Sequence, residues 1–71
     1  MVVMQGETPL EMGRRHIATN ERLIAEQKEM IERLRAQGHA TDEAEGMLRT
    51  LKRTLVSLHR HQALEEQKSA E

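Results

Sequence analysis

Two heptad-spaced stretches of apolar residues, separated by a glycine, restrict this chain more than any other feature of its sequence. In the second stretch the apolar residues alternate at steps of four and three, the pattern by which one helix packs along another. In the first stretch apolar residues recur every seven positions, which also indicates a helix with one apolar side. The apolar seam residues are Leu10, Ile17, Ile24, Ile31, Leu34, Ala44, Leu48, Leu51, Leu55 and Leu58.

Local signals indicate where the helices begin and end. Thr8 and Glu11 form a capping-box sequence, and Pro9 lies between them at the first helical position, where its missing N–H costs nothing. Gly38 can take the left-handed conformation that ends a helix. Thr41 is then the expected N-cap of a second helix, because acidic residues follow it at once and favour the positive end of the helix dipole.

These signals predict an all-α protein with one domain, an antiparallel two-helix hairpin, because a short turn leaves the two helices as neighbours. Gly13 and Gly46 each cost about 1 kcal/mol relative to alanine inside a helix, so the first helix is expected to fray before Arg14. The predicted segments are a disordered tail at 1–7, the hairpin at 8–67 (helices at 9–37 and 42–67, turn at 38–41) and a frayed C-terminus at 68–71.

Folding the chain back at Gly38 brings both apolar stripes into one antiparallel register. Ile31 then faces Leu48, Ile24 faces Leu55 and Ile17 faces Gln62, and the two residue numbers of each pair add up to the same value. A second set of pairs has a sum that is one lower: Leu34 with Ala44, Gln27 with Leu51, and Asn20 with Leu58.

Asn20 and Gln27 are the polar residues of the first seam. A buried amide needs a hydrogen-bond partner, so it disfavours slipped registers and oligomers with the wrong number of chains. We interpret both amides as register-fixing residues. The alternative is a ligand or ion site inside the helical assembly.

The apolar stripe on each predicted helix is wider than contact with one other helix can cover. Leu23 and Met30 flank the first seam, and Met47 flanks the second. Pairing of two hairpins into a four-helix bundle would cover these three residues, and twofold dimers are the commonest closed assembly. We therefore predict a homodimer with Leu23, Met30 and Met47 at its interface. The alternatives are a larger oligomer and a complex with an unidentified protein.

Composition restricts the partners and the compartment. The chain has no Cys, Phe, Trp or Tyr, so it offers no thiolate metal site and no aromatic platform for bases. Eleven basic and twelve acidic side chains leave a net charge of -1, which predicts no polyanionic partner. We expect no membrane span and no secretion signal, because no long apolar run occurs, and hence a cytoplasmic protein.

A basic stretch on the second helix supports the alternative function. Arg49, Lys52, Arg53 and Arg60 could contact phosphates, as in a small nucleic-acid-binding regulator. The simpler interpretation is a solvated helix face balanced by glutamates of the neighbouring helix. We therefore expect nucleic acid to be an unlikely partner.

The histidines give little support to metal binding or catalysis. A helical metal pair needs histidines four residues apart, and His59 and His61 are two apart. His16 comes near His61 in the predicted register, and whether these two pair or bind a metal stays open. Serines and glycines form no catalytic or phosphate-binding pattern. We predict no catalytic residue, no metal, no cofactor and no enzymatic activity.

The chain also resembles a group of short uncharacterised bacterial proteins, over about residues 14–64. The likeness lies in the patterns RHIA at 15–18, IAxQxxxIxxL at 24–34 and GHxT at 38–41, ahead of a leucine-rich second helix. Members of this group often carry an acidic residue where this chain has Ala40. The resemblance implies a small cytoplasmic bacterial protein and carries over no activity. Together with the residue patterns, we expect a homo-oligomeric protein-interaction or scaffold module.

Overall fold

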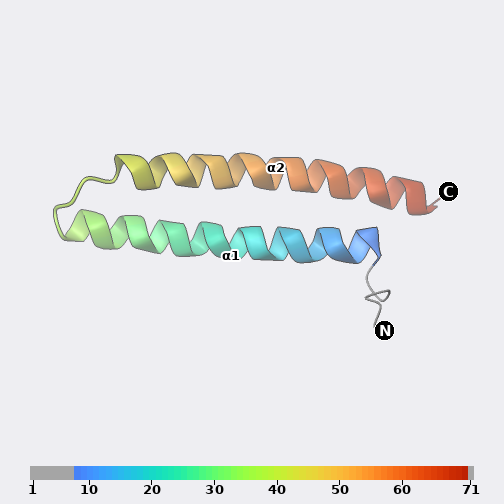
Figure 1. Ribbon diagram of the computed structural model, residues 1–71, viewed down its shortest axis with the longest axis horizontal. Coiled ribbons are helices and arrows are strands. Elements are labelled where there is room, and N and C mark those ends of the chain that lie inside the picture. The colour runs from blue at the N-terminus through green and yellow to red at the C-terminus, as the bar shows by residue number, and fades with distance from the viewer. Residues whose placement is uncertain (1–7, 71) are drawn as a thin grey trace, which may run out of the picture.

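The computed structural model describes residues 8–70, with side chains described for residues 8–68. Helix α1 (Pro9–Ala36) and helix α2 (Asp42–Ala70) lie side by side and antiparallel in a single layer (Figure 1). The predicted all-α hairpin is therefore confirmed, and α2 continues past its expected end at Gln67. The tail predicted at residues 1–7 lies outside the described residues, as does Glu71. Neither described helix is long and apolar enough to cross a membrane.

Helix α1 begins with the predicted capping box. The Glu11 backbone N–H donates to the Thr8 hydroxyl at 3.1 Å, and the Thr8 N–H donates to the Glu11 carboxylate at 2.9 Å. These two bonds satisfy donors that have no partner within the helix. The expectation that α1 frays before Arg14 was wrong, because the helix runs unbroken through Gly13. The contact that Gly13 makes is described below.

The turn is closed by backbone hydrogen bonds around Gly38, whose φ of 78° lies in the left-handed region. The His39 N–H donates to the Leu34 carbonyl at 2.8 Å, and the Gly38 N–H donates to the Arg35 carbonyl at 3.1 Å. These two bonds form a Schellman motif, which satisfies the last carbonyls of α1. The glycine predicted to end the first helix therefore does so.

A side-chain cluster ties the two helices together beside the turn. The Glu45 carboxylate accepts hydrogen bonds from Arg35 and from the Thr41 hydroxyl, each at 2.9 Å. Thr41 holds the start of α2, because its carbonyl accepts the Glu45 N–H at 2.8 Å. The Arg35–Glu45 ion pair is largely exposed, so it contributes no more than about 1 kcal/mol to stability. Its main effect is to hold the start of α2 next to the end of α1.

Several of the predicted pairs line common hollows along the helix contact. Ile31 and Leu48 line one hollow, and Gln27 and Leu51 line a second. Leu34 with Ala44, and Asn20 with Leu58, line two others. The contacts that join the helices nevertheless lie about one helical turn from the predicted register, because the Gln62 amide packs against Gly13 and donates to the Leu10 carbonyl, whereas the prediction sets Gln62 opposite Ile17.

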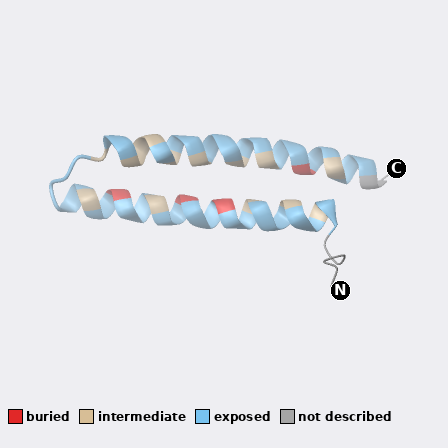
Figure 2. Cartoon of the chain, in the orientation of Figure 1, coloured by how far each residue is buried: buried red, intermediate tan, exposed pale blue. Residues whose placement is uncertain are grey.

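The interior of the hairpin is small. Ile24 and Ile31 are the hydrophobic side chains that the described part of the chain buries, and none of its side chains is fully enclosed (Figure 2). The remaining apolar seam residues stay half-buried: Leu10, Ile17, Leu34, Ala44, Leu48, Leu51, Leu55 and Leu58. A single layer of two helices leaves each seam covered on one side only.

Two glycines should respond to alanine in opposite directions. Gly46→Ala should raise the free energy of unfolding by about 0.5–1 kcal/mol, because a Cβ there meets nothing closer than an Arg49 guanidinium nitrogen at 3.5 Å. Gly38→Ala should lower it by about 1–2 kcal/mol, because alanine is strained at positive φ. Urea denaturation at equal protein concentration measures both. A stabilised Gly38→Ala variant would contradict the turn described above.

Candidate functional site

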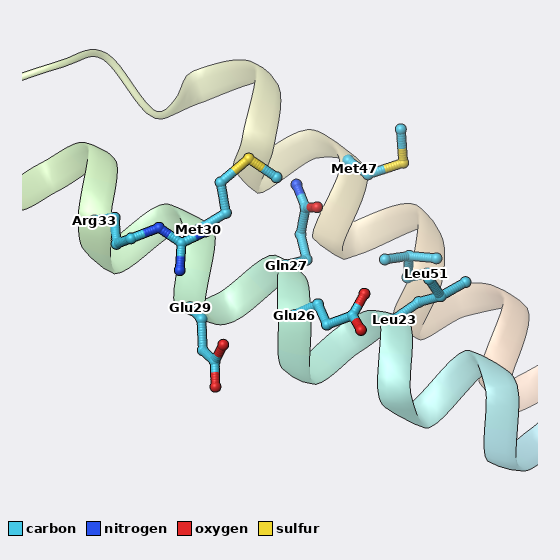
Figure 3. A pocket seen from close by; sticks show the side chains of 8 residues that line it. All are labelled: Leu23, Glu26, Gln27, Glu29, Met30, Arg33, Met47 and Leu51. Atoms are coloured by element: carbon cyan, nitrogen blue, oxygen red, sulfur yellow. The ribbon is translucent and has the colours of Figure 1, made fainter.

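One side of the hairpin carries a groove between the two helices, with a volume of about 530 Å³. Leu23 and Met30 of α1 and Met47 and Leu51 of α2 line it, and Gln27 projects between the helices (Figure 3). We call these five residues the apolar groove. Leu23, Met30 and Met47, predicted from the sequence as interface residues, are thus brought together, and they are 40%, 38% and 53% exposed.

The apolar groove continues in both directions along the same side. A hollow towards the turn shares Gln27, Met30 and Met47 with it, and a hollow towards the start of α1 shares Leu23. This side of the hairpin is therefore hollowed along most of its length. The added residues are Leu34, Ala40, Glu43 and Ala44 near the turn, and Arg15, His16, Thr19, Asn20, Thr54 and Leu58 at the other end.

A separate hollow lies on a charged stretch of the helix contact. It is lined by four charged residues and by the seam residues Ile31 and Leu48. By contrast, the charges that line the apolar groove belong to α1. The hairpin therefore offers one strongly apolar surface and one that is charged. The charged lining residues are Lys28, Glu32, Arg35 and Glu45 in this hollow, and Glu26, Glu29 and Arg33 along the apolar groove.

The two seam amides differ in how they are satisfied. Gln27 is half-buried, and its Nε2 donates to the Ala44 carbonyl at 2.9 Å, which links the helices near the turn. Asn20 is only 7% exposed, and its Oδ1 has no hydrogen-bond partner. A buried acceptor without a donor costs about 1–3 kcal/mol. Asn20 also lines the hollow next to the apolar groove, but its Oδ1 exposes less than 1 Å² of surface.

Gln62 is a buried polar residue whose role sequence reasoning missed. Its Nε2 donates to the Leu10 carbonyl at 3.1 Å, and its side chain is 6% exposed. A Cβ at Gly13 would collide with the Gln62 amide, so the glycine makes room for this side chain. The low helix propensity of glycine marks Gly13 as unusual in the sequence, but only the packed structure shows that the Gln62 side chain fills the space beside it.

The predicted basic stretch lies on α2 and is exposed. No acidic residue occurs between Glu45 and Glu65. The ion pairs among the described side chains join other residues. The exposed cations are therefore available for contacts with another molecule, and they are Arg49, Lys52, Arg53 and Arg60.

The histidines considered for metal binding do not gather into a ligand set. His61 Nε2 lies 3.9 Å from a Glu65 carboxylate oxygen on the same helix. His16 lines the hollow that contains Asn20. Within residues 8–68, no group of three or more His, Asp or Glu side chains is placed to hold a metal ion.

Comparison of the chain with protein-family models, curated proteins and solved structures gave no match. The resemblance to short bacterial helical proteins therefore remains an expectation from the sequence. The apolar groove and the basic stretch of α2 are therefore the features on which a proposed function can rest.

Proposed function

We propose that the chain is a cytoplasmic homodimerisation module. Two hairpins pack apolar groove against apolar groove as a four-helix bundle, whose outer faces serve as a protein-interaction or scaffold surface. The observation that carries this proposal is the apolar groove itself. Three large exposed hydrophobic side chains line it, whereas the hairpin buries two hydrophobic residues in its own interior.

Self-association is tested by sedimentation equilibrium over a range of protein concentrations. The unmodified chain should behave as a dimer, and Met30→Lys should weaken dimerisation at least tenfold, because it places a charge in the apolar groove. Val56→Lys is the matched control, since Val56 is 57% exposed and lies outside the groove lining. A folded single copy at high concentration, or equal effects of the two lysines, would refute the proposal.

A second candidate is a nucleic-acid-binding regulator that uses the basic stretch. The observation that favours it is the exposed, acid-free run of α2 that carries Arg49 and Arg53. A gel-shift assay at low salt tests it, because electrostatic affinity is greatest there. Retardation that disappears in the Arg49→Glu, Arg53→Glu double variant would support this candidate. No retardation of the unmodified chain would remove it.

A further inference from the structure

We infer that Met30 and Met47 are sites of reversible oxidation, and that their conversion to methionine sulfoxide by a hydroperoxide separates the two copies of the chain. This inference rests on the proposed homodimer and adds a regulation of the same apolar groove. It follows from the residues that line the groove, from their exposure in a single hairpin and from the side-chain chemistry that the sequence offers to an oxidant.

Two of the five residues of the apolar groove are methionines, one on each helix. Met30 belongs to α1 and Met47 to α2, and their side chains lie on either side of Gln27 (Figure 3). Both methionines are exposed in the single hairpin, so a small reagent in solution can reach them. A second copy packed against the apolar groove would cover both.

The sequence directs peroxide chemistry to methionine. The chain has no Cys, Trp or Tyr, so no thiol, indole or phenol competes with the thioether sulfurs for the oxidant. With hydrogen peroxide, the sulfur loses two electrons and forms a bond to one peroxide oxygen. The O–O bond breaks, and the other oxygen leaves as water. Methionine sulfoxide reductases reverse the change, so the modification can be removed again.

Oxidation alters the surface that the proposed dimer buries. A thioether is apolar and fits irregular gaps, whereas a sulfoxide is polar and its oxygen accepts hydrogen bonds from water. Packing a second copy against the groove would strip that water from an oxygen that lies beside Leu23 and Leu51. In the dissociated chain the oxygen stays hydrated, so the sulfoxide shifts the equilibrium towards single copies.

Met12 provides a control within the same chain. It lies on α1 and is 41% exposed, close to the exposure of Met30, but it does not line the apolar groove. Its oxidation should therefore leave dimerisation unchanged. Dimerisation should in turn leave the oxidation of Met12 unchanged, whereas it should protect Met30 and Met47.

Sedimentation equilibrium before and after treatment with hydrogen peroxide tests the inference. Oxidation of the unmodified chain should raise the dimer dissociation constant about tenfold or more, because it places polar groups in the apolar groove. The Met30→Leu, Met47→Leu double variant keeps the groove apolar and of similar volume. It should dimerise, and its dissociation constant should not change after the same treatment.

Met12→Leu is the matched control variant, and it should respond to peroxide as the unmodified chain does. Met1 and Met4 are present in every chain compared, so their oxidation is common to all of them. Treatment of the oxidised chain with a methionine sulfoxide reductase should restore the original dissociation constant.

Mass spectrometry of peptides supplies a second measurement that does not depend on the variants. At protein concentrations below the dissociation constant, peroxide should oxidise Met30 and Met47 about as fast as Met12, because all three are exposed in the single hairpin. At concentrations far above it, Met30 and Met47 should be oxidised several times more slowly, and the rate at Met12 should stay the same.

Dissociation of the oxidised unmodified chain, together with an unresponsive double variant, supports the inference. An equal response of the double variant overturns it and leaves the dimer standing, as does an unchanged dissociation constant once Met30 and Met47 are oxidised. If the double variant does not dimerise, the peptide measurement decides, because equal rates at all three methionines at high concentration overturn the inference. A single copy before any treatment overturns the proposed function as well.

Discussion

Ile24→Ala is expected to lower the free energy of unfolding by about 2–5 kcal/mol, the range measured when a large buried aliphatic side chain is truncated. Ile24 is 8% exposed and is one of two buried hydrophobic residues in the described hairpin. A chain with so small an interior has little left to compensate for this loss. The expected result is therefore a helical content that falls sharply at temperatures where the unmodified chain is folded.

Circular dichroism during thermal and urea denaturation measures this effect, at equal protein concentration because dimerisation makes stability concentration-dependent. Val56→Ala is the matched control, since it also truncates a β-branched residue in the middle of a helix but at a position that is 57% exposed. The control should change stability by no more than about 0.5 kcal/mol. Equal midpoints for the Ile24 and Val56 variants would show that the contact between α1 and α2 is not the core.

Asn20→Leu is expected to raise the free energy of unfolding by about 1–3 kcal/mol, because it removes a buried polar group whose oxygen has no donor within the hairpin. Leucine is larger than asparagine, and the adjoining hollow of about 400 Å³ provides space for it. The gain should come with a loss of specificity, because a buried asparagine fixes one assembly at a cost in stability. The leucine variant should therefore populate more than one assembly.

Urea denaturation measures the gain, and sedimentation equilibrium measures whether the leucine variant populates more than one assembly. Gln62→Leu is the comparison variant. It also removes a buried amide with an unpartnered oxygen, but it breaks the 3.1 Å hydrogen bond to the Leu10 carbonyl, so its net change should be close to zero. A less stable Asn20→Leu variant with a single assembly would show that the amide does not select the assembly.

The helix ends could be predicted from the sequence because the interactions that set them are local. The Thr8 capping box joins residues three apart, and the bonds around Gly38 join residues three to five apart. Such contacts depend on residue type and spacing, which the sequence states directly. The antiparallel pairing was predictable for a related reason, since a short turn leaves two helices as neighbours. The level of one helix along the other was not, because the contacts of Gln62 with Gly13 and Leu10 lie about one helical turn from the predicted pairing of Gln62 with Ile17.

The polar contacts between the helices could not be predicted in the same way. Gln27 and Gln62 reach carbonyl groups on the opposite helix, and each bond depends on a side-chain rotamer that is fixed only by packing. Gly13 shows the same limit, because its propensity suggested a weak helix start whereas its role is to admit a neighbouring amide. Burial also differed between the amides, since Asn20 is more enclosed than Gln27.

The antiparallel hairpin brings the start of α1 and the end of α2 to the pole away from the turn (Figure 1). A short peptide linker could therefore join these ends, and the backbone could be opened at the exposed Gly38–Ala40 turn instead. Such a circular permutant would keep every contact between α1 and α2 and lose only the local bonds of the turn. Tags or domains fused before α1 or after α2 would both emerge from this pole of the hairpin, leaving the turn free to touch a flat target.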